Sequence, residues 1–360
     1  MAFASASGYT NLPNGNFSSV IYSKKVQLAF RKKTVAGDIS NSDYFGEIAN
    51  QGDTVRIIKE PEISVSAYAR GTTIAPQDLN DADFSLVVDK ANYFAFKVDD
   101  IEEAHSHVNF MDLATNRAAY RLADQHDQEV LGYLSGYTQS ALHTNADTVN
   151  TTVNGTKADS AAGSDELLAS NKLNMASFGN ITTTPSTSTT GDSIPVAARL
   201  PGATALPTAY VSPVMLINRM ARILDQKNVD KEGRWIVIDP VLMEVLADED
   251  SRFLNGDFGT SGGLRNGLVI NNWNGFRVYV SNNLPSVGTG PATTGTTAQD
   301  DNYGVIVAGH DSAVATAEQI NKTETYRDPD SFADIVRGMH LYGRKILRPE
   351  ALVNARYNLA

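Results

Sequence analysis

Residues 233–253 read GRWIVIDPVLMEVLADEDSRF, a stretch in which a short apolar run is followed by a helix start and a group of acids. The run at 235–238 is typical of a buried strand, because it is short, apolar and rich in β-branched residues. Asp239 and Pro240 then suit the cap and the first residue of a helix. The stretch therefore predicts a buried strand that leads directly into an amphipathic helix at about residues 240–248.

The acids that end this stretch allow a metal site, a solvated helix end or a contact with basic groups of a neighbouring molecule. Glu244 and Asp248 are four residues apart and would share a helix face, so they could offer oxygen ligands to Mg²⁺ or Ca²⁺. However, no Asp-x-Asp-x-Asp-Gly loop accompanies them, and the helix dipole disfavours acids near a C-terminus. Arg252 follows Asp250 closely, which suits a surface of alternating charges. The pattern favours a solvated end or an intermolecular contact over a metal site.

The composition is that of a globular protein whose 360 residues allow two domains or one elaborated domain. A net charge of −11 argues against a protein that coats nucleic acid, since that role needs clustered Lys and Arg. The absence of cysteine excludes disulfides, thiolate zinc sites, iron–sulfur clusters and a cysteine nucleophile. No run is long and apolar enough for a membrane span, and no signal-peptide pattern is visible. We therefore expect folding in a cytoplasm, without a membrane partner.

The first hundred residues divide into an arm and a hairpin. Residues 1–52 predict an N-terminal arm with a basic patch, which is either a solvated face or a surface for phosphate or an acidic partner. This patch consists of Lys24, Lys25, Arg31, Lys32 and Lys33. Residues 53–98 alternate between apolar and polar positions and predict two long strands of a hairpin. Such a hairpin cannot bury its apolar faces alone, so we expect it to need another subunit.

Helical spacing of apolar residues predicts one long helix at about residues 107–142. Its apolar stripe comprises Ala119, Leu122, Ala123, His126, Val130, Tyr133, Leu134 and Tyr137. Charged positions beside the stripe include Arg121, Asp124, Asp127 and Glu129. At 1.5 Å per residue the helix would be about 50 Å long, which is too long for the core of a small domain. We expect a structural strut in which His126 is a packed or interfacial histidine.

The second half of the chain is predicted to alternate between strands and helices after a polar segment. Residues 144–210 are rich in Thr, Ser, Asn and Gly and are either a loop-rich surface insertion or a set of short strands. A helix is expected within 211–229. Strands are expected within 275–285, 303–309 and 312–320.

Other short motifs do not assemble a catalytic site. Residues 259–263 match the Gly-x-Ser-x-Gly spacing, but the pattern lacks the preceding strand and the following helix that this chemistry needs. Residues 309–312 place His, Asp and Ser side by side, whereas triad residues converge from separate segments, so we expect a turn. His105 and His107 lack a third spaced metal ligand. We therefore expect no enzyme, with no catalytic residue, no cofactor and no metal.

The order of these segments resembles the major capsid proteins of tailed bacteriophages, which have the Hong Kong 97-like fold. The resemblance rests on GRWIVIDP at 233–240, on the strand that leads into SNNLP at 281–285, and on VRGMHLYGRKILRPEAL at 336–352. It covers about residues 17–143 and 211–354. The polar segment between these two ranges departs from it.

The resemblance implies an α+β subunit that assembles itself into hexamers and pentamers of an icosahedral phage head around double-stranded DNA. Its parts would be an N-terminal arm, an extended hairpin loop, a peripheral domain with a spine helix, an insertion, an axial domain and a return to the peripheral domain. These parts would span 1–52, 53–98, 99–143, 144–210, 211–315 and 316–360. Scaffold and portal proteins would be partners, the basic arm would face the interior and touch DNA weakly, and assembly in a bacterial cytoplasm would yield the virion capsid. We expect inter-subunit contacts at Arg56, Lys59, Arg70, Glu244, Asp248, Asp250 and Arg252.

Two alternatives remain open on the sequence. The same fold serves encapsulin-type protein compartments, although the hairpin and arm follow the phage members. In a different class, Glu244 and Asp248 could serve a metal-dependent hydrolase.

Some shells of this fold also crosslink Lys to Asn with a Glu as base. Here no motif places the available residues, which are Lys59, Lys90, Lys97, Asn354 and Asn358.

Overall fold

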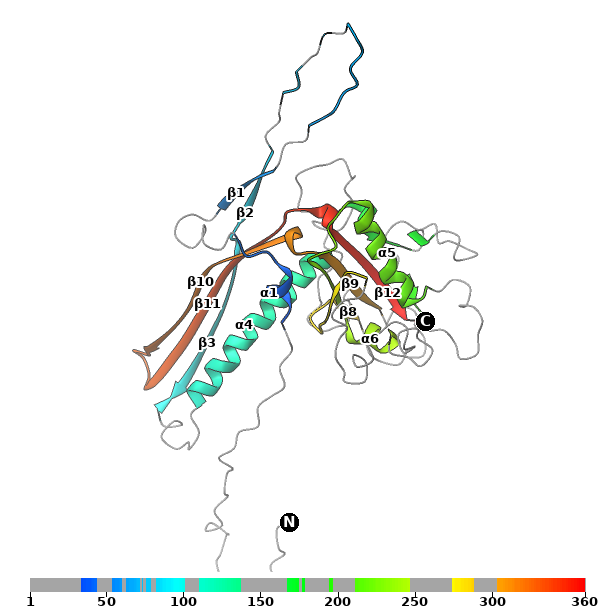
Figure 1. The fold of residues 1–360 in the computed structure, drawn as a ribbon. Helices are drawn as coiled ribbons and strands as arrows, with labels where there is room; N and C mark the ends of the chain where they lie inside the picture. The colour runs from blue at the N-terminus through cyan, green and yellow to red at the C-terminus, as the bar shows by residue number, and fades with distance from the viewer. Residues whose placement is uncertain are drawn as a thin grey trace, which may run out of the picture.

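The computed structural model describes three sheets, two of them antiparallel and one mixed, together with a long helix and a projecting loop (Figure 1). The described residues are 34–43, 54–59, 63–71, 73, 76–78, 82–100, 110–136, 167–174, 177–178, 194–196, 211–246, 274–287 and 303–359. The mixture of helices and sheets agrees with the predicted α+β class.

One sheet has three strands in the order β10–β11–β3, and all of its pairings are antiparallel. These strands are β3 (Lys90–Asp99), β10 (Val314–Arg327) and β11 (Ala333–Ile346). The helix α4 (Phe110–Ser135) runs alongside this sheet and reaches toward the second one (Figure 1). The sheet and the helix together form an elongated half of the molecule.

The second sheet has seven strands and forms the rounder half of the molecule. Its central order is β4–β12–β9–β6–β7, with β5 pairing to β12 and β8 pairing to β9. The strands are β4 (Lys172–Leu173), β5 (Ile194–Val196), β6 (Arg234–Ile238), β7 (Arg277–Val280), β8 (Ser286–Val287), β9 (Tyr303–His310) and β12 (Leu352–Leu359). The predicted C-terminal part, 316–360, therefore contributes to both sheets, since β12 lies in this one. The predicted insertion likewise contributes β4 and β5.

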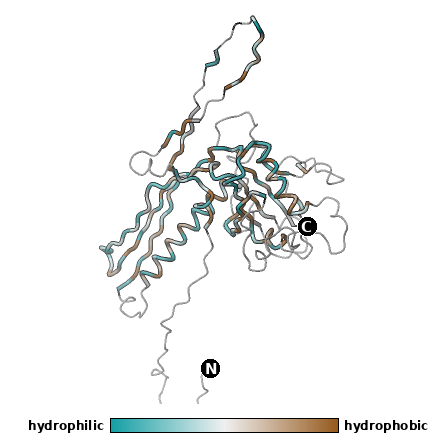
Figure 2. The backbone as a smooth tube through the Cα atoms, in the orientation of Figure 1, coloured by the Kyte–Doolittle hydropathy of each residue, from teal (hydrophilic) through white to brown (hydrophobic). Residues whose placement is uncertain are grey.

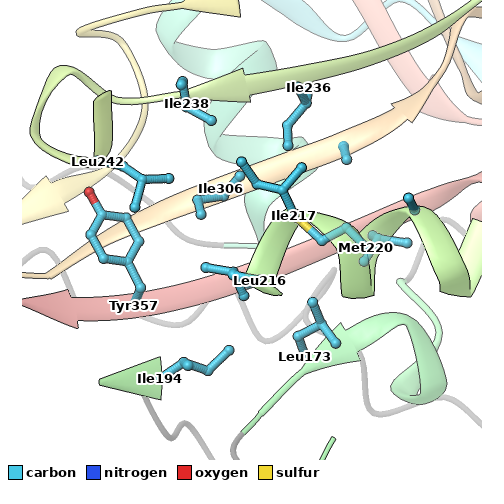
Figure 3. Close-up of a cluster of buried hydrophobic side chains, with 14 of the residues drawn as sticks. Leu173, Ile194, Leu216, Ile217, Met220, Ile236, Ile238, Leu242, Ile306 and Tyr357 are labelled. Carbon is cyan, nitrogen blue, oxygen red and sulfur yellow. The ribbon is translucent and has the colours of Figure 1, made fainter. Parts of the chain in front are cut away.

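Helices cover both faces of the seven-stranded sheet. The helix α5 (Pro213–Gln226) lies over one face, with side chains such as Leu216, Ile217 and Met220 pointing toward the strands (Figure 3). On the other face, the C-terminal part of α4 and the four-residue helix α1 (Ala36–Ile39) pack against apolar side chains of β6, β9 and β12. Three short 3₁₀ turns complete the described elements, namely η1 (Ala169–Asn171), η3 (Asp311–Ala313) and η4 (Pro349–Ala351).

The stretch that begins at Gly233 folds as its sequence predicts. Every residue of β6 is buried, with side chains alternating between the two core clusters. Asp239 caps the helix α6 (Pro240–Leu246), because its carboxylate accepts a hydrogen bond of 3.1 Å from the Leu242 backbone N–H. Residues 247–250, which include the remaining acids of the predicted helix end, lie outside the described residues.

The long helix differs from its prediction in length and in its buried face. Gly136, with a φ of 74°, follows the last helical residue, a position where glycine commonly ends a helix. The 26 helical residues span about 39 Å rather than the predicted 50 Å. Asp124 and Asp127 are buried, whereas Ala119 and Ala123 are exposed, so the predicted stripe was wrong at these positions. Burial of Asp127 is offset by hydrogen bonds from the Val35 and Ala36 backbone N–H groups at α1.

The predicted long hairpin is also only partly right. Its strands are six residues each, β1 (Thr54–Lys59) and β2 (Ala82–Val87), paired antiparallel. Residues 63–71 are described but form no strand. The second half of the predicted return strand is β3, which pairs with β11 and not with β1. Alternation identified an extended chain with two different faces, but it could not identify the partner of each segment.

Candidate functional site

The surface that the described residues leave uncovered is the candidate functional site, and its main part is the projecting loop, which comprises β1, β2 and the chain between them. The base of this loop is anchored in the body, because Leu86 and Val88 are buried against Ala315 and Ala317 of β10. The backbone at Val88 passes close to Gly343 of β11. A Cβ atom at this glycine would lie only 3.0 Å from the Val88 Cα, so the contact requires a residue without a side chain. Beyond this base the loop projects away from the rest of the molecule (Figure 1).

The projecting loop carries large apolar side chains that nothing in the described chain covers. Val65 is 97% exposed and Ile58 is 75% exposed, and Ile63 and Tyr68 are exposed as well. Figure 2 shows hydrophobic positions, in brown, on this projecting part of the chain, away from the three-stranded and seven-stranded sheets. The two sides of the loop are linked by Gln77, whose side-chain oxygen accepts hydrogen bonds from the Ser64 backbone N–H at 3.1 Å and hydroxyl at 2.7 Å. An exposed apolar surface of this kind marks a place where another molecule binds.

The outer face of the three-stranded sheet is a second uncovered surface. Side chains alternate along a strand, so the odd-numbered residues of β11 point away from α4. Met339 lies opposite Tyr93 on this face, and Tyr93 is 80% exposed. Charged groups border the apolar ones, since Arg337 pairs with Glu324 at 2.9 Å and lies 5.0 Å from the centre of the Tyr326 ring. The face thus combines aromatic and charged contacts.

The far end of this sheet is held together by ion pairs around an exposed aromatic ring. Lys97 of β3 pairs with Asp328 at 2.7 Å, and Arg327 pairs with Asp100. The hydrogen bond from Arg327 lowers the pKa of Asp100, and the hydrogen bond from Lys97 lowers the pKa of Asp328. Phe332, in the turn between β10 and β11, is 79% exposed. The turn therefore exposes the Phe332 ring at its tip, while the ion pairs of Lys97 and Arg327 stabilise its base.

The predicted contact residues whose side chains the structure describes lie on separate parts of the molecule. Arg56 and Arg70 are exposed on the projecting loop, and Glu244 is exposed on α6 in the seven-stranded half. Figure 1 shows the loop projecting away from the body that carries α6, so a pairing between them needs a second copy of the chain. The other predicted residues have side chains outside the described residues, namely Lys59, Asp248, Asp250, Arg252, Lys24, Lys25, Arg31, Lys32 and Lys33.

The candidate catalytic motifs have other structural roles where they are described. The turn predicted at 309–312 is only partly right, because Gly309 and His310 end β9 and the chain turns at η3. His310 Nδ1 accepts a hydrogen bond of 3.1 Å from the Ser312 backbone N–H. Within the described part of the chain, no group of three or more His, Asp or Glu side chains is arranged to hold a metal ion. The Gly-x-Ser-x-Gly segment, His105 and His107 lie outside that part. The described helices include none that is long and apolar enough to cross a membrane.

The candidate crosslinking residues take part in other interactions. Lys97 is paired with Asp328, and Lys90 lies 3.2 Å from Asp89. Asn354 is buried and donates a hydrogen bond of 2.7 Å to the Ser135 carbonyl at the end of α4. The side chains of Lys59 and Asn358 lie outside the described residues. The described geometry therefore gives the crosslinking hypothesis no support.

Sequence reasoning missed Asp127, which holds this scaffold in place. Its carboxylate is fully buried and accepts hydrogen bonds from α1 and from the Asn283 side chain beyond β7. A signal was present, because Asp127 stands three, four and seven residues before Val130, Leu131 and Leu134, all of which are buried. An acid in line with such a stripe indicates a buried hydrogen-bonded group rather than a solvated one.

Comparison with solved structures finds this arrangement in phage capsids. Comparisons with family models and with curated protein sequences each found no match. A structure described as Mycobacterium phage Che8 matches with a TM-score of 0.66 and 24% identity, over 94% of this chain and 97% of that chain. The capsid structure of cyanophage P-SCSP1u matches with a TM-score of 0.60 and 19% identity, over 96% and 94%. The mature capsid of bacteriophage PhiM1 matches with a TM-score of 0.57 and 15% identity, over 95% and 92%. The chain therefore has the α+β Hong Kong 97-like capsid fold, as predicted.

Proposed function

We propose that this chain is a major capsid protein, a structural subunit that assembles into hexamers and pentamers of an icosahedral phage head. The observation that carries the proposal is a fold shared with phage capsid structures over nearly the whole length of both chains. No inserted catalytic domain is needed to account for the length, since the match covers 94% of this chain and 97% of the first structure named above.

The exposed surfaces support an assembling subunit. A loop with Val65, Ile58 and Tyr68 in solvent would be an aggregation hazard in a free monomer. In a closed shell the same side chains would be covered by a neighbour, and symmetry would repeat each modest contact many times. We propose that the loop lies over a neighbouring subunit and that its Arg56 and Arg70 meet acids there. We propose the same kind of contact for Glu244, Asp248, Asp250 and Arg252.

The remaining partners and the location follow from the proposed role. Scaffold and portal proteins would guide closure, and assembly would take place in the cytoplasm of a bacterial host before the protein becomes the virion capsid. Double-stranded DNA would be enclosed without tight binding, because the chain carries a net charge of −11. The basic residues of the N-terminal arm, from Lys24 to Lys33, would be the part that faces the DNA.

Particle formation tests the proposal directly. The chain is expressed in bacteria with and without a co-expressed scaffold, then analysed by gel filtration and negative-stain electron microscopy. Closed shells or capsomers support a capsid subunit. If only monomers and dimers form under every condition, the capsid function is rejected.

The two alternatives predict different outcomes in the same preparation. An encapsulin-type compartment would also form shells, but it would load a cargo protein in place of DNA. The hydrolase alternative would predict an activity that Ala substitution of both Glu244 and Asp248 abolishes without a change in particle size. The solved structures that resemble this chain are phage capsids, so they give this second alternative no support.

A further inference from the structure

Titratable side chains gather at the contact between α4 and the inner face of the three-stranded sheet. We call this group the helix–sheet cluster. The helix contributes two of its members, β11 contributes three, and β10 and β3 contribute one each. They are His126, Glu129, His340, Tyr342, Arg344, Glu318 and Asn92. The capsid role proposed above uses none of them.

Three aromatic rings form the centre of the helix–sheet cluster. The His126 ring stands edge-on to Tyr342 at 4.7 Å and to His340 at 5.4 Å, measured between ring centres. His340 and Tyr342 are stacked at 4.9 Å. His126 Nε2 and His340 Nδ1 are buried and have no hydrogen-bond partner among the described residues. The two imidazoles are therefore packed as neighbouring rings, each with a nitrogen shielded from water.

Only one carboxylate of the helix–sheet cluster is directed at the histidines. Glu318 of β10 lies 3.2 Å from His340 Nε2. Glu129 accepts a hydrogen bond from the Tyr342 hydroxyl and lies 3.4 Å from Arg344, so its charge is already balanced. Asn92 of β3 donates to the Tyr342 hydroxyl at 3.2 Å. The described ion pair therefore joins a carboxylate of the cluster to His340, and among the described residues no such pair joins one to His126.

The chemistry of this packing opposes protonation of His126. Burial lowers the pKa of His126 below its ordinary value of 6.5, and His340 lowers it further. The charges of Glu318 and Asp127 oppose this shift, while Arg344 adds to it. Asp127 is already occupied, since both of its oxygens accept hydrogen bonds from other groups. The packed arrangement therefore keeps His126 neutral, whereas a solvated His126 would gain a proton as the pH falls through 6.5.

We propose that the helix–sheet cluster is an acid-sensitive joint, which holds α4 against the three-stranded sheet at neutral pH and loosens in mild acid. The sign follows from linkage. A histidine whose pKa is lowered in the packed state binds fewer protons there, so the packed state loses stability as the pH falls below 6.5. The Glu318–His340 pair acts in the same direction at lower pH, because the hydrogen bond from His340 lowers the pKa of Glu318 and the pair is lost when Glu318 is protonated.

Amide hydrogen exchange of the full chain at pH 7.5 and pH 5.0, corrected for intrinsic rates, tests the joint. We expect peptides from 119–133 and 336–346 to lose protection in acid by about tenfold, because the opened state takes up a proton that the packed state excludes. Peptides from 213–226, in α5 of the seven-stranded half, should not change. The variant His126→Phe keeps an aromatic ring without a proton site and should remove the response. The control His310→Gln alters a histidine outside the helix–sheet cluster and should retain it.

Two results would overturn the proposal. One is exchange in 119–133 that is independent of pH in the wild-type chain, and the other is an unchanged acid response in His126→Phe. If that variant does not fold, histidine side-chain hydrogen exchange in the wild-type chain measures the pKa of His126, and a value at or above 6.5 refutes the joint. These measurements do not require assembled shells, so they test the joint separately from the capsid function. A chain that forms particles can lack the acid response, and a chain that forms no particles can show it.

Discussion

The side-chain amide of Asn283 donates a hydrogen bond of 2.7 Å to the carboxylate of Asp127, across 156 positions of sequence. Both residues are fully buried. The other oxygen of the same carboxylate accepts hydrogen bonds from the N–H groups of Val35 at 2.7 Å and Ala36 at 2.6 Å. One acid on α4 therefore connects the start of α1 with the segment between β7 and β8.

Replacement of Asp127 by Ala is expected to destabilise the unassembled subunit strongly. Three buried donors lose their acceptor, and each costs about 1 to 3 kcal/mol, so we expect a loss of about 3 kcal/mol or more. The free energy of unfolding in urea measures this. The control Asn116→Ala changes an exposed position of the same helix and should stay within about 0.5 kcal/mol of wild type. Equal stabilities of the two variants would contradict the role assigned to Asp127.

The buried carboxyl of Asp239 should make stability depend on pH. Burial raises its pKa above the ordinary value of 3.8, although hydrogen bonds from Tyr357 and Leu242 oppose the shift. The folded chain then binds more protons than the unfolded chain, so this group's contribution to stability falls as the pH rises from 3.8 through the raised pKa. Asp239→Asn keeps a capping side chain but cannot titrate. Urea unfolding between pH 4 and 7 should show the variant gaining stability relative to wild type, and parallel pH profiles would contradict the prediction.

Gly309 should not tolerate a side chain, whereas Gly37 should. A Cβ at Gly309 would lie 2.6 Å from Leu352 Cδ2 and 2.9 Å from Trp235 Cζ2, inside a packed core. We expect Gly309→Ala to cost about 1 to 3 kcal/mol. A Cβ at Gly37, in α1, would meet nothing within 4 Å, so Gly37→Ala should be neutral or should stabilise by about 0.5 kcal/mol. Melting temperatures of the two variants give the comparison, and the reverse order would show that the core relaxes around the new methyl group.

The projecting loop should matter for assembly and not for folding. Val65 is 97% exposed, so Val65→Asp should leave circular dichroism and the unfolding free energy within about 0.5 kcal/mol of wild type. In a shell the same charge would be placed against a neighbour, and the yield of particles in a sucrose gradient should drop at least tenfold. Asn116→Asp adds an equal charge at an exposed site outside the loop and should assemble normally. Normal yield from Val65→Asp would remove the loop from the interface.

The charged contact predicted from the sequence can be tested by exchange of charges between subunits. Arg70→Glu alone, and Asp248→Lys with Asp250→Lys, should each reduce assembly, because each brings like charges together across the interface. The variant that combines all three changes should recover part of the yield if Arg70 meets these acids. Full yield from either single set would contradict a role in assembly, and absence of recovery would mean that the two sets do not face one another.

Local patterns in the sequence were sufficient to predict the secondary-structure elements that are determined by residues close together in the chain. The apolar run, Asp239 and Pro240 predicted β6 and the start of α6. These features depend on side-chain period and on capping, which act within a few residues. The same patterns, taken in order, indicated the Hong Kong 97-like fold.

Tertiary structure decided which segments meet, and with that which polar groups are buried. Alternation showed that 90–98 is extended, but only the fold pairs it with β11 in place of β1. Helical spacing placed Asp127 beside the apolar stripe, and only the fold shows that α1 and Asn283 donate hydrogen bonds to it. His126 and His340 are more than two hundred positions apart, so no local signal could bring their rings together. The sequence by itself determined the elements and the fold class, because the spacing of apolar residues along the chain follows the period of a helix or of a strand. Burial, pairing and electrostatic environment had to come from the structure, because they are properties of contacts between distant segments.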